Sequence, residues 1–261
     1  VHRAGFLMAP IDLETGKFLE EPKPVWGGTG GNAPEAPHIY KTRGYYYQVI
    51  AEGGTELGHM VTVARSKNLY GPYESCPYNP ILTHRDQKGA LIQATGHADF
   101  IEDENGDWWA FFLGYRQTHQ YFHHLGRETF LAPIEWKDDW PIINGGNPIT
   151  TVMETEQGTA VQKRKKDYQT DFSDGVPFEW VYLRNPSEEC YQTGKNGLAL
   201  TGNEHTLSDV ANPAFLGFRQ RDLTADFEVD LTFSPARNHE EAGLSVFYKY
   251  DAHLDVYITK E

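Results

Sequence analysis

An internal repeat of roughly sixty-five residues constrains the fold of this chain more than any other feature. Each copy begins with two apolar, aromatic runs joined by a short turn, and a third and a fourth run follow. Runs rich in aromatic and β-branched residues, separated by Gly, Asn and Asp, are typical of strands. Four strands in each copy predict two blades of a β-propeller. The predicted strands are 37–41, 45–50, 58–65 and 71–74 in the first copy, and 98–102, 108–113, 126–133 and 140–143 in the second.

A third, incomplete copy stands at the start of the chain. Residues 5–12 match the segment that begins at Gly126, including an Ala-Pro-Ile string at 9–11 and again at 132–134. Propellers usually close with about four to eight blades, and two and a half blades cannot close a ring. We therefore expect a half blade at the N-terminus of a fragment that lacks at least one and a half further blades.

The pattern changes after Asn144. Residues 227–233 alternate between apolar and polar side chains, and 244–248 and 253–259 also predict strands. Such a pattern is typical of an antiparallel sheet in a β-sandwich. The chain is thus predicted to be all-β, with a partial propeller domain over 1–158 and a partial sandwich domain over 159–261. Because the sequence stops directly after a strand, we expect a clipped C-terminus as well.

Composition excludes several kinds of partner. The chain has 23 Lys and Arg against 37 Asp and Glu, a net charge of −14, which argues against a nucleic-acid or anionic membrane surface. No apolar run is long enough to span a membrane. A soluble protein with a neutral partner such as a polysaccharide is expected. Its compartment, extracellular or cytoplasmic, is undecided, because a truncated chain would have lost any signal peptide.

Four polar side chains stand at or near matching ends of the predicted inner strands. Glu35 lies between Pro34 and Pro37, whose rings are expected to hold the backbone extended and fix the direction of the carboxylate. His97 falls within a residue of the equivalent position in the second copy, and His59 and Arg127 match each other. This coincidence predicts a lined central cavity, although a lone Glu in a loop is more often a surface residue.

Each of these side chains has a functional and a structural interpretation. A Glu that is partly shielded from water has a raised pKa and can act as a general acid. His97 is either a hydrogen-bonded structural residue or a ligand to a substrate or an ion. Arg127 either binds a sugar hydroxyl or carboxylate through its fork, or pairs with Glu128 or another acid.

Several strings of this chain, in the right order, resemble glycoside hydrolase family 43. The resemblance is strongest to its two-domain β-xylosidase and α-L-arabinofuranosidase branch. It implies a five-bladed propeller followed by a concanavalin- or jelly-roll-like β-sandwich. It also implies inverting hydrolysis of xylan-derived or arabinose-substituted saccharides. The strings are Glu35-Ala36-Pro37-His38-Ile39-Tyr40-Lys41, Ala51-Glu52-Gly53-Gly54-Thr55, Val63-Ala64-Arg65-Ser66, Gly96-His97-Ala98, Leu125-Gly126-Arg127-Glu128-Thr129 and Pro213-Ala214-Phe215-Leu216-Gly217.

The resemblance also implies roles for individual residues. Glu35 matches the general acid, Arg127 an arginine that contacts the sugar in the innermost subsite, and Thr55 a threonine near that sugar. His97 matches a histidine that faces a central calcium or water cluster, so a structural, mostly water-coordinated calcium is expected there and no cofactor is required for the chemistry. His59, at the repeat position of Arg127, is expected to line the same substrate site.

Two aspartates of the family pattern have no counterpart among the matched residues. One activates the attacking water and the other tunes and orients the acid, and both belong to blades that precede Glu35. Asp12 repeat-matches Glu135 at the far end of a strand and is a poor candidate for either role. Both roles are left unassigned, and the fragment by itself is expected to be inactive.

Other functions remain open at this stage. A non-catalytic carbohydrate-binding propeller could use Glu35 and Arg127 to hold hydroxyl groups, and a protein-interaction propeller is disfavoured by the long, unequal repeats. The expected partner is a xylo-oligosaccharide or an arabinoxylan-type chain. The choice between xylosidase and arabinofuranosidase, and the oligomeric state, are not determined by these residues.

Overall fold

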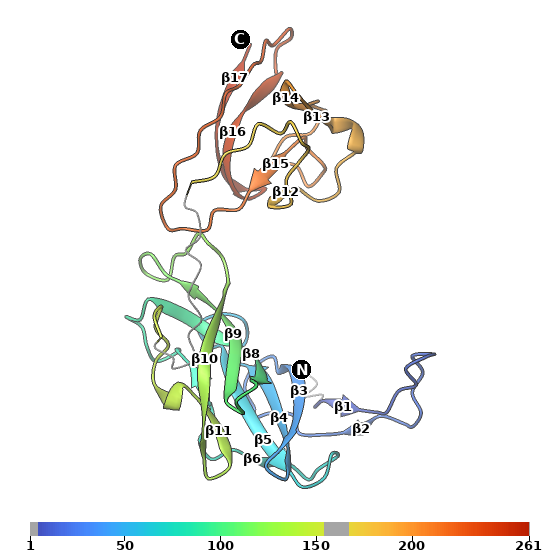
Figure 1. Ribbon diagram of the computed structural model, residues 1–261, viewed down its shortest axis with the longest axis vertical. Coiled ribbons are helices and arrows are strands. Elements are labelled where there is room, and N and C mark those ends of the chain that lie inside the picture. Colours follow the sequence, from blue (N-terminus) through green and yellow to red (C-terminus); the bar gives the residue numbers. More distant parts are fainter. Residues whose placement is uncertain (1–4, 154–166, 261) are drawn as a thin grey trace. The chain divides into compact units, whose positions relative to one another are not determined.

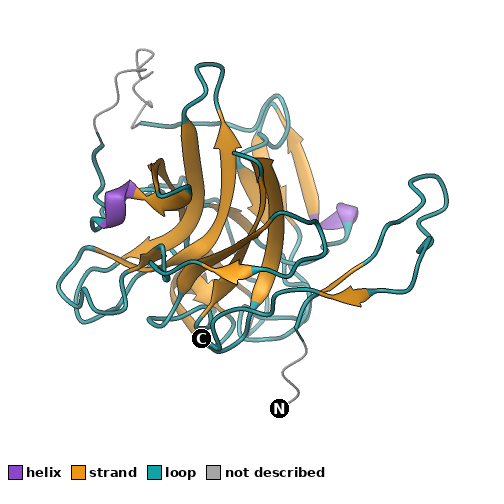
Figure 2. Ribbon diagram, turned by 90° about the horizontal axis from the view of Figure 1, so that it is seen from below, coloured by secondary structure: helices purple, strands orange, loops and turns teal. Residues whose placement is uncertain are grey.

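The computed structural model describes residues 5–153 and 167–260, and it divides the chain into two compact units, 1–157 and 158–261. The described residues form strands, loops and two short 3-10 turns, η1 (Asn144–Gly146) and η2 (Glu188–Cys190), without an α-helix (Figure 2). The predicted all-β class is therefore confirmed. The predicted domain boundary at 158/159 lies outside the described residues. No helix within the described ranges has the length and apolar character needed to cross a bilayer.

The first blade contains β3 (Glu35–Thr42), β4 (Tyr45–Glu52), β5 (Met60–Ser66) and β6 (Glu74–Ser75), paired antiparallel in this order (Figure 1). A further short strand, β7 (Leu82–Thr83), also pairs with β5. Because β6 lies opposite one end of β5 and β7 opposite the other, the outer strand of this blade is split in two. The fourth strand expected at 71–74 therefore overlaps β6 only at Glu74, and the second piece was not predicted.

The second blade repeats this arrangement without the split. Its sheet has the order β11-β10-β9-β8. The four strands fall where the repeat predicts them, and the sheet has the expected four-stranded meander. They are β8 (Ile92–Glu102), β9 (Trp108–Arg116), β10 (Glu128–Lys137) and β11 (Trp140–Ile143).

The predicted half blade is present in reduced form. Strand β1 (Leu7–Met8) pairs antiparallel with β2 (Lys23–Pro24), so only two residues of the segment 5–12 belong to a strand. Figure 1 shows this hairpin extending away from the two blades. Leu13 and Phe18 near its tip are largely exposed, so the hairpin tip gains little stability from burial.

Aromatic side chains fill the space between the two blades. Tyr47 packs edge-on against Trp136 and Trp140, at 5.4 and 6.4 Å between ring centroids. Tyr40 stacks on Phe100 at 5.2 Å. Aromatic pairs of this kind add about 0.5–1.5 kcal/mol beyond their buried area. The shared core therefore fixes how one blade faces the other.

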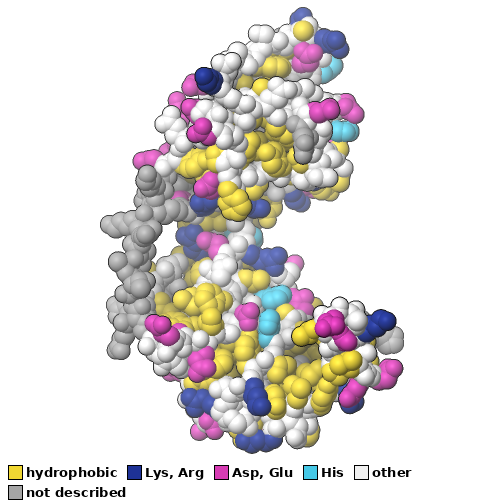
Figure 3. Space-filling view, turned by 45° about the vertical axis from the view of Figure 1, so that its right-hand side comes forward, with side chains coloured by type: hydrophobic (Ala, Val, Ile, Leu, Met, Phe, Trp, Pro, Cys, Tyr) yellow, Lys and Arg dark blue, Asp and Glu magenta, His cyan; other side chains and the backbone are white. Residues whose placement is uncertain are grey.

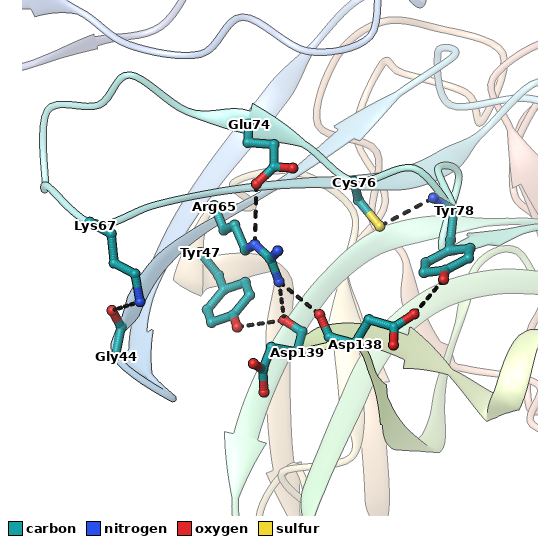
Figure 4. A network of polar contacts seen from close by, with 9 residues as sticks. All are labelled: Gly44, Tyr47, Arg65, Lys67, Glu74, Cys76, Tyr78, Asp138 and Asp139. Atoms are coloured by element: carbon teal, nitrogen blue, oxygen red, sulfur yellow. Dashed lines mark hydrogen bonds and ion pairs between the residues drawn. The ribbon is translucent and has the colours of Figure 1, made fainter.

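A polar network crosses the same interface (Figure 4). The Arg65 guanidinium on β5 lies over the rings of Tyr45 and Trp140, at 4.5 and 4.0 Å from their centroids. Its Nη1 donates hydrogen bonds to the carbonyl oxygens of Asp138 and Asp139 in the β10–β11 turn, at 2.9 and 3.2 Å. Arg65 thus ties the first blade to the outer hairpin of the second.

The C-terminal unit contains three antiparallel strand pairs in its described part. The pair β16 (Glu241–Lys249) and β17 (Ala252–Thr259) confirms the strands predicted at 244–248 and 253–259. The other pairs are β12 (Trp180–Tyr182) with β15 (Leu216–Phe218), and β13 (Tyr191–Gly194) with β14 (Gly197–Leu200).

The prediction of a strand at 227–233 is wrong, because these residues form a loop. Phe227, Val229 and Leu231 are exposed instead of facing a core. Alternation supplies a potential apolar face, but a strand also needs a partner for its backbone hydrogen bonds, and β16 pairs with β17. Figure 3 shows hydrophobic side chains at the surface of this unit.

Candidate active site

Glu35 is positioned by a β-bulge at the start of β3. Glu35 lies opposite Ala51 and the next regular pair is His38 with Val49, so the register shifts between them. Ala36 inside the bulge has a φ of 50°. The expectation of an extended backbone before Pro37 is therefore wrong at Ala36. Bulges re-aim the neighbouring side chain, and a non-glycine residue at positive φ is a strained position of a kind that concentrates at functional sites.

His97 occupies the corresponding bulge in the second blade. Gly96 lies opposite Leu113 and Asp99 opposite Phe111, and His97 between them has a φ of 58°. His97 is thus the structural counterpart of Ala36, one residue beyond that of Glu35. The repeat match made from sequence is confirmed, and its cause is a bulge shared by the two inner strands.

The two bulges bring the carboxylate and the imidazole together. His97 Nδ1 lies 3.6 Å from Glu35 Oε1, and the side chains are 39% and 52% exposed. A pair this exposed contributes little to stability, because water screens its charges. The shielding from water that was expected around Glu35 is not provided by the described residues.

His59 is the buried member of the group. It is 1% exposed, and its ring meets that of His97 edge-on at 6.4 Å between centroids. Nδ1 lies 3.1 Å from the carbonyl oxygen of Ala94. Because a carbonyl only accepts, Nδ1 carries the proton and Nε2 keeps a lone pair, for which the described residues offer no hydrogen-bond partner. Burial lowers the pKa of His59, which favours this neutral form.

Arg127 precedes β10 directly, as His59 precedes β5. Its Nη1 donates a hydrogen bond to Thr55 Oγ1 at 3.2 Å. The alternative pairing with Glu128 is not observed, because Glu128 accepts two hydrogen bonds of 2.9 Å from Arg116. Arg127 is therefore held by a neutral hydroxyl group, and its guanidinium makes no ion pair with Glu128.

Thr55 owes its position to the turn that follows β4. Gly53 and Gly54 have φ values of 89° and 78°, which glycine adopts without strain. A Cβ at Gly53 would lie 1.9 Å from the carbonyl oxygen of Gly58, so this turn closes only around glycine. All five side chains singled out from sequence thus lie at the same end of the two blades, Thr55 in the loop between the second and third strands.

Three side chains here offer donor atoms to a metal ion. One ligand atom each from Glu35, His59 and His97 lies within 4.8 Å of the others. Calcium takes about six to eight oxygen ligands, whereas this set offers one carboxylate and two imidazoles. The described residues therefore do not fit calcium by themselves. Imidazole with carboxylate is a donor set better suited to zinc and other transition metals.

Glu52 was missed by reasoning from sequence. It is completely buried at the end of β4, three positions before Thr55. A signal was available, since Glu52 is an acidic residue at the end of an otherwise uncharged strand and is followed by two glycines.

Both units match known protein families. Residues 2–141 match the model of the glycosyl hydrolases family 43, and residues 169–261 match that of the beta xylosidase C-terminal concanavalin A-like domain. A non-reducing end alpha-L-arabinofuranosidase of Bacteroides ovatus is 36% identical over 99% of this chain and 50% of its own length. A xylosidase/arabinosidase of Butyrivibrio fibrisolvens is 35% identical over 96% of this chain and 50% of its own length.

Solved structures agree with the sequence matches. The GH43B protein of a Bacteroides ovatus xyloglucan locus superposes with a TM-score of 0.89 at 35% identity, covering 99% of this chain and 52% of that one. The GH43 protein BlXynB of Bacillus licheniformis gives 0.88 at 35% identity, with 98% and 51% covered. The chain spans about half the length of the relatives it matches.

Proposed function

Because this chain belongs to family 43 of the glycosyl hydrolases, we propose that the protein hydrolyses glycosidic bonds of xylan-derived or arabinose-substituted saccharides. The observation that carries this proposal is that two pairs of side chains, Glu35 with His97 and Arg127 with Thr55, lie at the same end of the two blades. These side chains supply a proton donor, an imidazole beside it and two hydrogen-bonding groups suited to sugar hydroxyls.

In the proposed reaction Glu35 protonates the oxygen of the departing sugar while the glycosidic bond breaks. Arg127 and Thr55 bind hydroxyl groups of the sugar in the innermost subsite, on the other side of the broken bond. His97 faces Glu35 and orients its carboxyl group, and His59 supports His97 from the buried side. Substrate contact by His59 itself stays a prediction, because its ring is buried.

Hydrolysis of this kind needs a second carboxylate to activate water, and inverting enzymes hold the two about 6.5–9.5 Å apart. Within the described group Glu35 is the one carboxylate. The water-activating and orienting aspartates are therefore not assigned to residues of this chain, and inversion is proposed from the family alone. A calcium held mainly by water at His97 also stays a prediction, and no step depends on it.

The test compares Glu35→Gln with wild type in the protein that carries this chain. Xylobiose and an arabinofuranosyl xylo-oligosaccharide need a protonated leaving oxygen, so turnover should fall about 10²–10⁴-fold. Hydrolysis of 4-nitrophenyl xyloside or arabinofuranoside should fall much less, because nitrophenolate leaves without a proton. Glu102→Gln, at an exposed end of β8, is the matched control and should change neither.

The same measurements identify the alternatives. The ratio of xyloside to arabinofuranoside turnover decides between the two activities. The wild-type protein could instead bind xylo-oligosaccharides tightly and hydrolyse none of these substrates. That result would contradict the proposed hydrolytic activity and favour a carbohydrate-binding propeller.

A further inference from the structure

Glu52 is a buried acidic residue to which the proposed reaction gives no role. We infer that Glu52 is a positioning residue for the general acid. It anchors residues 26–32, here called the strap, which lead directly into Glu35. This inference rests on the proposed function, because it concerns how the acid of that reaction is held in place.

The Glu52 carboxylate collects five hydrogen bonds, four of them from the strap. The backbone N–H of Thr29 donates to both oxygens, at 3.1 and 2.9 Å, and that of Gly31 donates at 2.8 Å. The hydroxyl groups of Thr29 and Thr62 donate at 3.0 and 2.5 Å. The two backbone N–H groups, one on each side of Gly30, converge on one anion as in a nest, which here encloses a side chain of the same protein.

These contacts suit a carboxylate better than a neutral amide. Two of the donors are backbone N–H groups that cannot reverse, whereas the hydroxyl groups of Thr29 and Thr62 can donate or accept. A carboxylate accepts through both oxygens, whereas the amide of Gln accepts through one and presents donors at the other. Glu52→Gln therefore keeps the shape of the side chain but removes the negative charge, which weakens the hydrogen bonds that the backbone of the strap donates to it.

Two glycines of the strap allow its close approach to Glu52. A Cβ at Gly28, which has a φ of 100°, would lie 2.6 Å from Glu52 Oε1. A Cβ at Gly31 would lie 2.6 Å from the end of the Met60 side chain and 3.0 Å from Glu52. The strap is therefore fitted to Glu52 by shape as well as by hydrogen bonding.

Strand β4 and the turn after it hold the strap at two further points. Gln48 Nε2, in a fully buried side chain, donates to the carbonyl oxygen of Trp26 at 2.7 Å. The N–H of Gly53 donates to the carbonyl oxygen of Asn32 at 2.7 Å. The strap itself forms no strand, so these contacts with β4 and with the turn after it fix its course.

The position of Glu35 follows from that of the strap. After Asn32 the chain passes through Ala33 and Pro34 and reaches Glu35, which pairs with Ala51 beside Glu52. On the other side of Glu52, Gly53 and Gly54 lead to Thr55, the partner of Arg127. Glu52 thus stands where the segments carrying the acid and a sugar-binding hydroxyl diverge. A misplacement of about 1 Å can reduce a rate about 10²-fold.

The test uses Glu52→Gln and Gly28→Ala, with Glu102→Gln as control. Hydrogen exchange followed by mass spectrometry should show faster exchange of amides within 27–36 in the first two variants, and no change in the control. The kcat/KM for xylobiose should fall at least about tenfold while that for 4-nitrophenyl xyloside changes less than about threefold, because only xylobiose needs a well-placed acid. Gly28→Ala leaves the buried carboxyl group unchanged and remains informative if Glu52→Gln folds poorly.

A purely structural role predicts a different result. Loss of folded protein would reduce the hydrolysis of both substrates equally, and that outcome would refute the inference. Unchanged hydrogen exchange of residues 27–36 in both variants would refute it as well. Failure of the proposed function is distinguishable, since the wild-type protein would then hydrolyse neither substrate.

Discussion

Arg65→Ala should loosen the joint between the two blades of the N-terminal unit. The arginine side chain is only 14% exposed, and its guanidinium lies between the rings of Tyr45 and Trp140. It also donates to the carbonyl oxygens of Asp138 and Asp139 (Figure 4). Alanine removes both kinds of contact at once and leaves two turn carbonyls without this donor.

The structure gives the size of the effect. Two hydrogen bonds from a charged group contribute about 1.5 kcal/mol each at the lower end of their range. Two cation–π contacts contribute about 0.5 kcal/mol each at the lower end of theirs. The free energy of unfolding should therefore fall by about 4 kcal/mol. For a unit of this size the midpoint of thermal unfolding should drop by about 8–16 °C.

Lys67→Ala is the matched control for this change. Lys67 also lies over the Tyr45 ring, at 3.3 Å, and donates to the carbonyl oxygen of Gly44, but it is exposed and bonds only within the first blade. Its loss should cost less than about 1 kcal/mol. Arg65→Lys should fall between the two, because an ammonium group cannot reproduce the forked, stacked geometry.

Thermal unfolding followed by tryptophan fluorescence measures these differences, and hydrogen exchange in the β10–β11 turn locates them. The reasoning would be refuted if Arg65→Ala lowered the midpoint no more than Lys67→Ala does. It would also fail if exchange in the turn stayed at the wild-type rate.

Two further predictions concern His84 and Arg127. Burial lowers the pKa of His84, whose Nδ1–H donates to Ile92 and whose Nε2 accepts from the N–H of Ile149. The contribution of neutral His84 to the free energy of unfolding should be complete above about pH 6.5. It should be lost as pH falls below that value, by up to about 1.4 kcal/mol per pH unit. Urea unfolding between pH 7.5 and 5.5 should show that the free energy of unfolding depends less on pH in His84→Gln than in wild type. Arg127→Met should raise KM for xylobiose. Because Arg127 is exposed, the midpoint of thermal unfolding should stay within about 2 °C of wild type. A large loss of stability would contradict the assignment of Arg127 to the sugar site.

The sequence alone determined the features that depend on local pattern. Two copies of a strand–turn–strand unit were readable, because aromatic and β-branched runs between turn residues specify strands without reference to distant partners. The match of His97 to the neighbourhood of Glu35 followed from the same repeat, and the structure explains it by paired bulges at Ala36 and His97.

Features that depend on distant partners were decided only by the tertiary structure. The alternation at 227–233 predicted a strand, yet no strand formed, because backbone pairing is chosen by which segments meet and not by the pattern of one of them. The split of the outer strand into β6 and β7 along β5 also depends on which segments meet. Arg127 meets Thr55 across 72 positions of the chain, and Glu52 meets Thr29 across 23. Side-chain identity makes such hydrogen bonds available, but only the packed blades decide which donor reaches which acceptor.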